Sequence, residues 1–188
     1  MFVILGLGNP GQSYGKTRHN AGFMAIDLLA SESGVKIDRQ GDGYVCGVCR
    51  VGEEEVALAK PLTYMNLSGG AAERLLRLYG GSPASLIVVY DDCDLELGRL
   101  RIGKGGGSGG HRGVASIMER LGTPDFLRLR LGIGRPPSGT ELSDYVLLPF
   151  GPEEKEVFED ELKRAAAALT DIIKNGADFA MNLHNARQ

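Results

Sequence analysis

Residues 86–90, "LIVVY", are the stretch that decides the fold class. The run is apolar without interruption and rich in β-branched side chains, which is typical of a strand buried on both faces of a sheet. Other strand patterns lie at residues 2–8, 44–50, 55–60 and 126–133, with a weaker one at 97–102. Helical patterns alternate with them, at about residues 20–32, 67–79, 112–121 and 153–175. This alternation predicts an α/β fold whose sheet is largely parallel or mixed.

The organisation of the chain is simple. A length of 188 residues predicts a single domain over residues 1–188, large enough to bury a core. Neither an internal repeat nor an interdomain linker is visible. The segment 43–60 has the pattern of a hairpin, so it adds antiparallel strands to the sheet.

The composition and the N-terminal sequence indicate the cellular compartment of the protein. Hydrophobic residues make up 43% and charged residues 24%, as in ordinary globular chains. No apolar run approaches the roughly 20 residues that span a bilayer, and the opening "MFVILGLGNPG" lacks the basic region and cleavage site of a signal peptide. Three cysteines fit a reducing compartment. We therefore expect a cytoplasmic protein with no membrane association.

Cys46 and Cys49 form a C-x-x-C motif, which raises the question of a zinc or redox site. They lie in "YVCGVCRV", a strand pattern, and positions three apart on a strand point to opposite faces. No second pair of ligands follows nearby. We expect neither zinc nor redox chemistry here.

The net charge of −3 conceals an uneven distribution. Between Arg99 and Arg135 there are eight Lys or Arg residues against two acids, whereas from Gly151 onward eight acids face five bases. A basic middle beside an acidic tail suggests one face suited to a polyanion. An ordinary mixed-charge surface remains the alternative.

The first loop contains a dinucleotide-binding pattern, because Gly6, Gly8 and Gly11 spell G-x-G-x-x-G after a strand. That fingerprint needs a helix to begin within the glycines, so that its N-terminus meets the pyrophosphate. Here Pro10 has no backbone N–H, and the predicted helix begins only at Asn20. We expect no nucleotide cofactor.

A second pattern is "GGSGG", residues 106–110, which matches the G-x-S-x-G turn of serine hydrolases. A catalytic triad would need a histidine and an acid further along the chain. His111 is too close to Ser108 to be the usual third member, and His184 lies near the C-terminus. Glycine-rich loops match this pattern often, so a serine nucleophile is disfavoured.

A third possibility is a histidine base without a protein nucleophile. His19 lies in a polar loop after the first strand, and a neutral imidazole can take a proton from water when its other nitrogen is held by an acceptor. Asp91 leaves the buried strand 86–90 and is a candidate for that acceptor. Asn9 and Asn66 follow a strand or open a helix, and their amides both donate and accept. The alternatives are a helix-start histidine with local bonds and, for Asn66, a helix N-cap.

Five motifs in a fixed order make the sequence similar to a known family. "GLGNPG" with Tyr14 and "TRHNAG", then "KPLTYMNLSG", "VVYDDCDLELG", "GGGSGGHRG" and "LRLGIG", occur in the order and spacing of bacterial-type peptidyl-tRNA hydrolase. The chain resembles this family over essentially all of residues 1–150. The resemblance implies a monomeric α/β domain with a twisted mixed sheet flanked by helices. It implies hydrolysis of the ester between a peptide and the 3′-terminal ribose of tRNA. This reaction recycles tRNA from stalled translation, and the resemblance implies that it needs no metal or organic cofactor.

The resemblance also assigns roles to side chains. It implies that His19 activates water, that Asp91 orients His19, and that Asn9 recognises the peptide side and discriminates blocked from free aminoacyl-tRNA. It places four further side chains around the scissile ester: Tyr14, Tyr64, Met65 and Asn66.

The basic residues agree with a tRNA partner. Arg128 and Arg130 share one face of the strand at 126–133, and Arg101 and Lys104 lead into the glycine-rich run, so all four are candidates for phosphate contacts that read no base sequence. One departure stands out: Arg112 occupies a position where the family usually has asparagine. Arginine cannot accept a hydrogen bond. This leaves open a paralogue that binds RNA or protein without catalysis.

Overall fold

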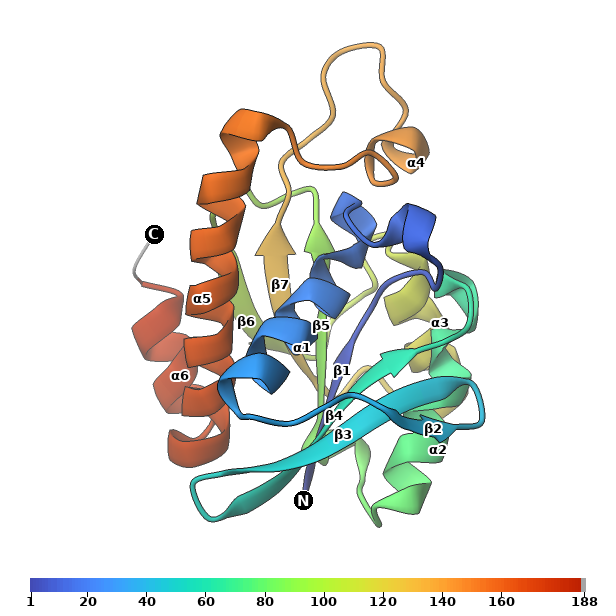
Figure 1. Ribbon diagram of the computed structural model, residues 1–188, viewed down its shortest axis with the longest axis vertical. Coiled ribbons are helices and arrows are strands. Elements are labelled where there is room, and N and C mark those ends of the chain that lie inside the picture. Colours follow the sequence, from blue (N-terminus) through green and yellow to red (C-terminus); the bar gives the residue numbers. More distant parts are fainter. Residues whose placement is uncertain (187–188) are drawn as a thin grey trace.

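One mixed sheet forms the centre of the computed structural model, which describes residues 1–186 (Figure 1). In these residues the strand order is β2-β3-β4-β1-β5-β7-β6. The strands are β1 (Phe2–Gly6), β2 (Arg39–Gly41), β3 (Tyr44–Val51), β4 (Glu54–Pro61), β5 (Leu86–Asp92), β6 (Leu100–Lys104) and β7 (Leu127–Gly132).

The pairing confirms a sheet that is parallel in its centre and antiparallel at its edges. Strands β4, β1, β5 and β7 run parallel as neighbours. The predicted hairpin is the antiparallel pair of β3 and β4, and β6 pairs antiparallel with β7. Strand β6 lies slightly later than the predicted 97–102. Strand β2 had no sequence signal, because its three residues, "RQG", are polar or glycine.

Helices cover both faces of the sheet, as predicted (Figure 1). Helices α1 and α5 pack on one face, and α2 and α3 on the other. The helices are α1 (Ala21–Glu32), α2 (Ser68–Leu78), α3 (Arg112–Leu121), α4 (Leu142–Tyr145), α5 (Pro152–Asn175) and α6 (Ala177–His184). None of the helices in residues 1–186 has the length and apolarity that crossing a membrane requires.

Strand β5 explains why "LIVVY" is apolar throughout. Ile87 and Val89 are buried against α1 and α5, whereas Leu86, Val88 and Tyr90 are buried against α2 and α3. Successive side chains of a strand point to opposite faces, so a strand with a helix layer on each side needs apolar residues at every position.

The C-x-x-C motif follows the same rule. Cys46 is buried on the α2 and α3 face, and Cys49 packs on the opposite face of β3. The two thiols therefore point away from each other, as the strand pattern predicted.

Candidate active site

A cavity of about 810 Å³ lies beyond the carboxyl ends of the central strands. Strands β1 and β5 are parallel neighbours, so the loops that follow them meet at one edge of the sheet. Most of the site residues expected from the sequence line this cavity: Asn9, His19, Tyr64, Met65, Asn66, Asp91, Arg101, Lys104, Arg112 and Arg130. Tyr14 does not line it; this side chain belongs to a 3-10 turn, Gln12–Tyr14, in the loop before His19.

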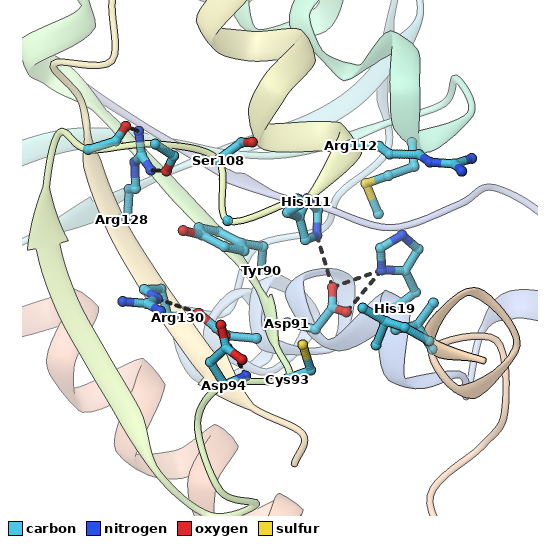
Figure 2. Close-up of a pocket in the computed structure, with 18 of the residues that line it drawn as sticks. His19, Tyr90, Asp91, Cys93, Asp94, Ser108, His111, Arg112, Arg128 and Arg130 are labelled. Atoms are coloured by element: carbon cyan, nitrogen blue, oxygen red, sulfur yellow. Dashed lines mark hydrogen bonds and ion pairs between the residues drawn. The ribbon is translucent and has the colours of Figure 1, made fainter. Parts of the chain in front are cut away.

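His19 and Asp91 are in direct contact, although 72 residues separate them in the sequence (Figure 2). Nδ1 of His19 lies 3.0 Å from each carboxylate oxygen of Asp91. Because a carboxylate accepts hydrogen bonds, the proton of the neutral ring belongs on Nδ1. Nε2 then keeps a lone pair, and it has no hydrogen-bond partner within residues 1–186.

His111 binds the same carboxylate, and sequence reasoning missed it. Its Nε2 lies 3.1 Å from Oδ1 of Asp91. Its Nδ1 accepts hydrogen bonds from the backbone N–H groups of Gly113 at 3.2 Å and Val114 at 3.3 Å, so His111 caps helix α3. The ring is therefore neutral with its proton on Nε2, which it donates to Asp91. The available signal was the position of His111 just before the predicted helix 112–121, where side chains accept backbone N–H bonds.

The electrostatics of Asp91 favour the ionised form. Burial alone would raise the pKa of this carboxyl group, but the hydrogen bonds from His111 and His19 outweigh burial and hold its pKa well below the usual range. Asp91 is therefore ionised and places its negative charge beside the His19 ring.

The same three side chains invite the question of a metal. One nitrogen of each histidine and one oxygen of Asp91 lie within 4.8 Å of one another. However, Nε2 of His111 carries the ring proton, because Nδ1 accepts two backbone N–H bonds, so Nε2 has no lone pair for a metal ion. Moving the proton to Nδ1 would set it against those two donors. The donor set fits hydrogen bonding and does not fit a metal ion.

Asn9 is held so that only its NH₂ group remains free. Its side-chain oxygen accepts the backbone N–H of Met65 at 2.9 Å, and its backbone is bridged by the amide of Asn20. The Nδ2 donor therefore remains for a ligand. Asn66 lies in a 3-10 turn, Met65–Leu67, and makes no capping bond, so the N-cap alternative does not apply to it.

The loop that carries His19 is fixed to the segment between α4 and α5. The backbone N–H of His19 donates to the carbonyl of Val146 at 2.8 Å. The buried guanidinium of Arg18 pairs with Glu154 at 2.6 Å and lies 4.2 Å from the centre of the Tyr145 ring. These contacts hold the imidazole in place before a substrate arrives.

The basic side chains differ in what they already bind. Arg101, Lys104 and Arg112 are exposed and form no ion pair within residues 1–186. Arg130 pairs with Asp92. Arg128, which the strand pattern grouped with Arg130 as a phosphate contact, is buried and instead donates to backbone carbonyls of the glycine-rich loop.

The glycines of the first loop allow helix α1 to pack closely on β1. An added Cβ at Gly6 would lie 2.3 Å from the carbonyl oxygen of Gly22, and one at Gly8 would lie 2.7 Å from the Phe23 ring. In the second glycine-rich pattern, the Ser108 hydroxyl has no hydrogen bond to a histidine ring within residues 1–186. The first glycine pattern therefore serves helix packing and not dinucleotide binding, and the second does not form a serine–histidine pair in the described part of the chain.

The fold and this site define a class: α/β proteins in which a histidine held by a buried carboxylate lines a cavity at the carboxyl edge of the sheet. The model of one family, peptidyl-tRNA hydrolase, matches residues 3–188, and the chain belongs to this family. A peptidyl-tRNA hydrolase of Moorella thermoacetica is 48% identical over 186 residues, which cover 98% of each chain. One from Dehalococcoides mccartyi is 47% identical over 188 residues, covering 98% of this chain and 100% of the relative.

A solved structure agrees with these relatives. The crystal structure of peptidyl-tRNA hydrolase from Acinetobacter baumannii matches with a TM-score of 0.91 and 33% identity, over 99% of this chain and 95% of that chain. The protein is an enzyme that hydrolyses peptidyl-tRNA. A paralogue without catalysis is not favoured.

Proposed function

We propose that His19 is the general base of the hydrolysis. Its Nε2 takes a proton from a water molecule as the water oxygen attacks the ester carbonyl between the peptide and the 3′-terminal ribose. Asp91 keeps the Nδ1 proton in place and stabilises the imidazolium. The imidazolium then gives its proton to the departing ribose oxygen, so the products are a peptide acid and a free tRNA, with no covalent intermediate. The observation that carries this proposal is the 3.0 Å contact of His19 Nδ1 with both oxygens of Asp91.

The peptide side of the substrate is assigned to the asparagines and their neighbours. The free NH₂ group of Asn9 donates to a carbonyl of the blocked amino acid, which distinguishes it from a charged free amine. Asn66, Tyr64 and Met65 line the cavity next to Asn9 and add polar and apolar contacts. Tyr14 contributes from the loop outside the cavity. No metal or organic cofactor is needed in this scheme.

The RNA side is assigned to Arg101, Lys104, Arg112 and Arg130. The first three have no acidic partner within residues 1–186, so their charge is available to phosphates. Binding through such contacts weakens steeply as salt rises. We assign the enzyme to the cytoplasm, where it acts as a monomer on peptidyl-tRNA and so recycles tRNA from stalled translation.

Replacement of His19 tests the proposal. With an N-blocked aminoacyl-tRNA as substrate, His19→Ala is expected to lose at least about 100-fold in kcat, the scale of a missing general base. His184→Ala is the matched control, because His184 also binds a carboxylate, Asp171 at 2.7 Å, but lies outside the cavity lining. Equal rates for His19→Ala and the parent would remove His19 from the mechanism.

A further inference from the structure

The glycine loop, residues 105–110, is held from one side by a buried arginine. Nη1 of Arg128 donates to the carbonyl oxygen of Gly107 at 2.5 Å, and Nη2 donates to that of Gly106 at 2.8 Å. Arg128 is itself fixed, since it also reaches the carbonyl of Pro124 and stacks on the Phe126 ring at 4.7 Å. Two successive carbonyls of the loop therefore point toward one guanidinium.

The direction of the carbonyls determines the direction of the next N–H groups. In a trans peptide the C=O of one residue and the N–H of the next point opposite ways, and residues 1–186 contain no cis peptide. The N–H groups of Gly107 and Ser108 therefore point away from Arg128. Neither finds an acceptor in the described part of the chain. Two adjacent donors are thus available to a ligand.

The loop also leaves room for a close approach. A Cβ added at Gly106, Gly107, Gly109 or Gly110 would meet no atom within 4 Å. At Gly107 the backbone is not in the left-handed region, so its conformation does not require glycine there. The missing side chain at Gly107 instead exposes the backbone donors.

The surrounding charges favour an anion. Each aspartate that lines the cavity already has a partner: Asp91 binds two histidines, Asp92 binds Arg130, and Asp94 binds Arg135. By contrast, Arg101 and Lys104 lead into the loop without an acidic partner in residues 1–186. Free N–H donors beside unpaired cations form an environment in which a phosphate is stabilised.

The position of the loop separates this anion from the reacting ester. In Figure 2, Ser108 and Arg128 lie on the far side of Tyr90 and His111 from His19. We propose that the N–H groups of Gly107 and Ser108 bind a phosphodiester of the RNA strand next to the ester-bearing ribose, and that Arg128 is a positioning residue that aims them. This proposal rests on the proposed function and names the part of the substrate that the glycine loop binds.

A pair of small inhibitors tests the site. Cytidylyl-(3′→5′)-adenosine has one charged phosphodiester, and its methylphosphonate analogue is nearly isosteric but neutral. Each compound is tested as a competitor of N-blocked aminoacyl-tRNA. For the parent enzyme we expect the charged dinucleotide to have an inhibition constant at least about tenfold lower than the analogue, as for a charge-assisted contact.

Variants then assign that preference to the loop. Arg128→Lys keeps the charge but cannot hold both carbonyls, and Gly107→Ala places a methyl group in the open space without a clash. Both are expected to reduce the ratio of the inhibition constants to below about twofold. Gly70→Ala, in α2 and outside the cavity lining, is the matched glycine control and keeps the parent ratio.

Three outcomes would overturn the proposal: a ratio near one in the parent enzyme, no inhibition by either compound at millimolar concentration, or an unchanged ratio in folded Gly107→Ala. Circular dichroism establishes folding, and Gly107→Ala decides if Arg128→Lys does not fold. If the proposal that His19 is the general base were wrong, only the rates of His19→Ala would show it, and the inhibition constants would not change. The two failures are therefore distinguishable.

Discussion

Asp91 and His111 form a contact that connects helix α3 to His19 through one shared carboxylate. Nε2 of His111 lies 3.1 Å from Oδ1 of Asp91, while Nδ1 of the same ring caps the first turn of α3. His19 binds the same carboxylate from another direction. One negative charge therefore serves two donors, of which only His19 has a nitrogen left for chemistry.

Replacement of His111 by asparagine separates its two contacts. Asparagine is a good N-cap, so it preserves the start of α3, but it is too short to donate to Asp91. A carboxylate with one donor fewer stabilises the imidazolium of His19 more strongly. The acid limb of the kcat/KM profile is expected to move up by about half to one pH unit, the equivalent of one hydrogen bond. Rates measured from pH 5 to pH 9 test this.

The comparison with His111→Ala completes that experiment. Alanine removes the cap as well, so we expect it to lower the free energy of unfolding by about 1 kcal/mol relative to His111→Asn. If His111→Asn kept both the parent rate and the parent pH profile, His111 would serve only as a helix cap.

Replacement of Asp91 by asparagine alters the tautomer of His19. The amide oxygen accepts from Nε2 of His111, which leaves the NH₂ group facing Nδ1 of His19. That arrangement moves the His19 proton to Nε2 and removes the base. We expect kcat to fall by at least about 100-fold. Asp171→Asn is the control, because it changes the carboxylate that binds His184. A loss of less than tenfold in Asp91→Asn would contradict the role of Asp91 in holding the His19 tautomer.

The fold was predictable where a residue pattern directly reflects burial. "LIVVY" showed a strand covered on both faces, and the segment 112–121 matched α3 at both ends. Helix α6 was missed, because it is only eight residues long and follows α5 after the single residue Gly176. Gly176 has a φ of 86° and interrupts what would otherwise continue as one helix.

The contact between His19 and Asp91 was predictable from the order of the strands. Asp91 lies near the carboxyl end of β5 and His19 lies in the loop that follows β1, and these two strands are parallel neighbours, so both side chains reach one edge of the sheet. The sequence analysis considered His111 only as a catalytic partner of Ser108, whereas in the structure its hydrogen-bond partner is Asp91. Arg128 shares a strand face with Arg130, but strand alternation does not reveal that the glycine loop covers one arginine and not the other.

The departure at position 112 leads to a prediction about RNA binding. The Arg112 guanidinium is exposed at the cavity and unpaired within residues 1–186. Arg112→Asn is expected to keep kcat/KM within about tenfold, because one polar contact contributes about 1–2 kcal/mol. The slope of log KM against log salt should become smaller by about one, as for one lost phosphate contact. A collapse of activity would show that Arg112 has a role that asparagine cannot fill.

A buried carboxyl group outside the cavity governs a different property, stability. Glu161 of α5 is fully buried, and its two oxygens accept the backbone N–H groups of Gly132 at 2.6 Å and Gly98 at 2.9 Å. Burial raises the pKa of Glu161 to about 8, although the two N–H groups and Arg164 lower it in part.

The raised pKa fixes the sign of a pH effect on folding. Between about pH 4.5, the ordinary pKa, and about pH 8, folded Glu161 holds a proton that the unfolded chain releases, so the free energy of unfolding falls as pH rises. Glu161→Gln does not titrate. At pH 5 the melting temperature of Glu161→Gln should be lower than that of the parent, because one hydrogen bond is lost. Between pH 5 and pH 8 the melting temperature of the variant should fall by at least about 3 °C less than that of the parent. Glu159→Gln, exposed on the same helix, should keep the parent slope. Parallel melting curves for Glu161→Gln and the parent would show that Glu161 is already ionised at pH 5.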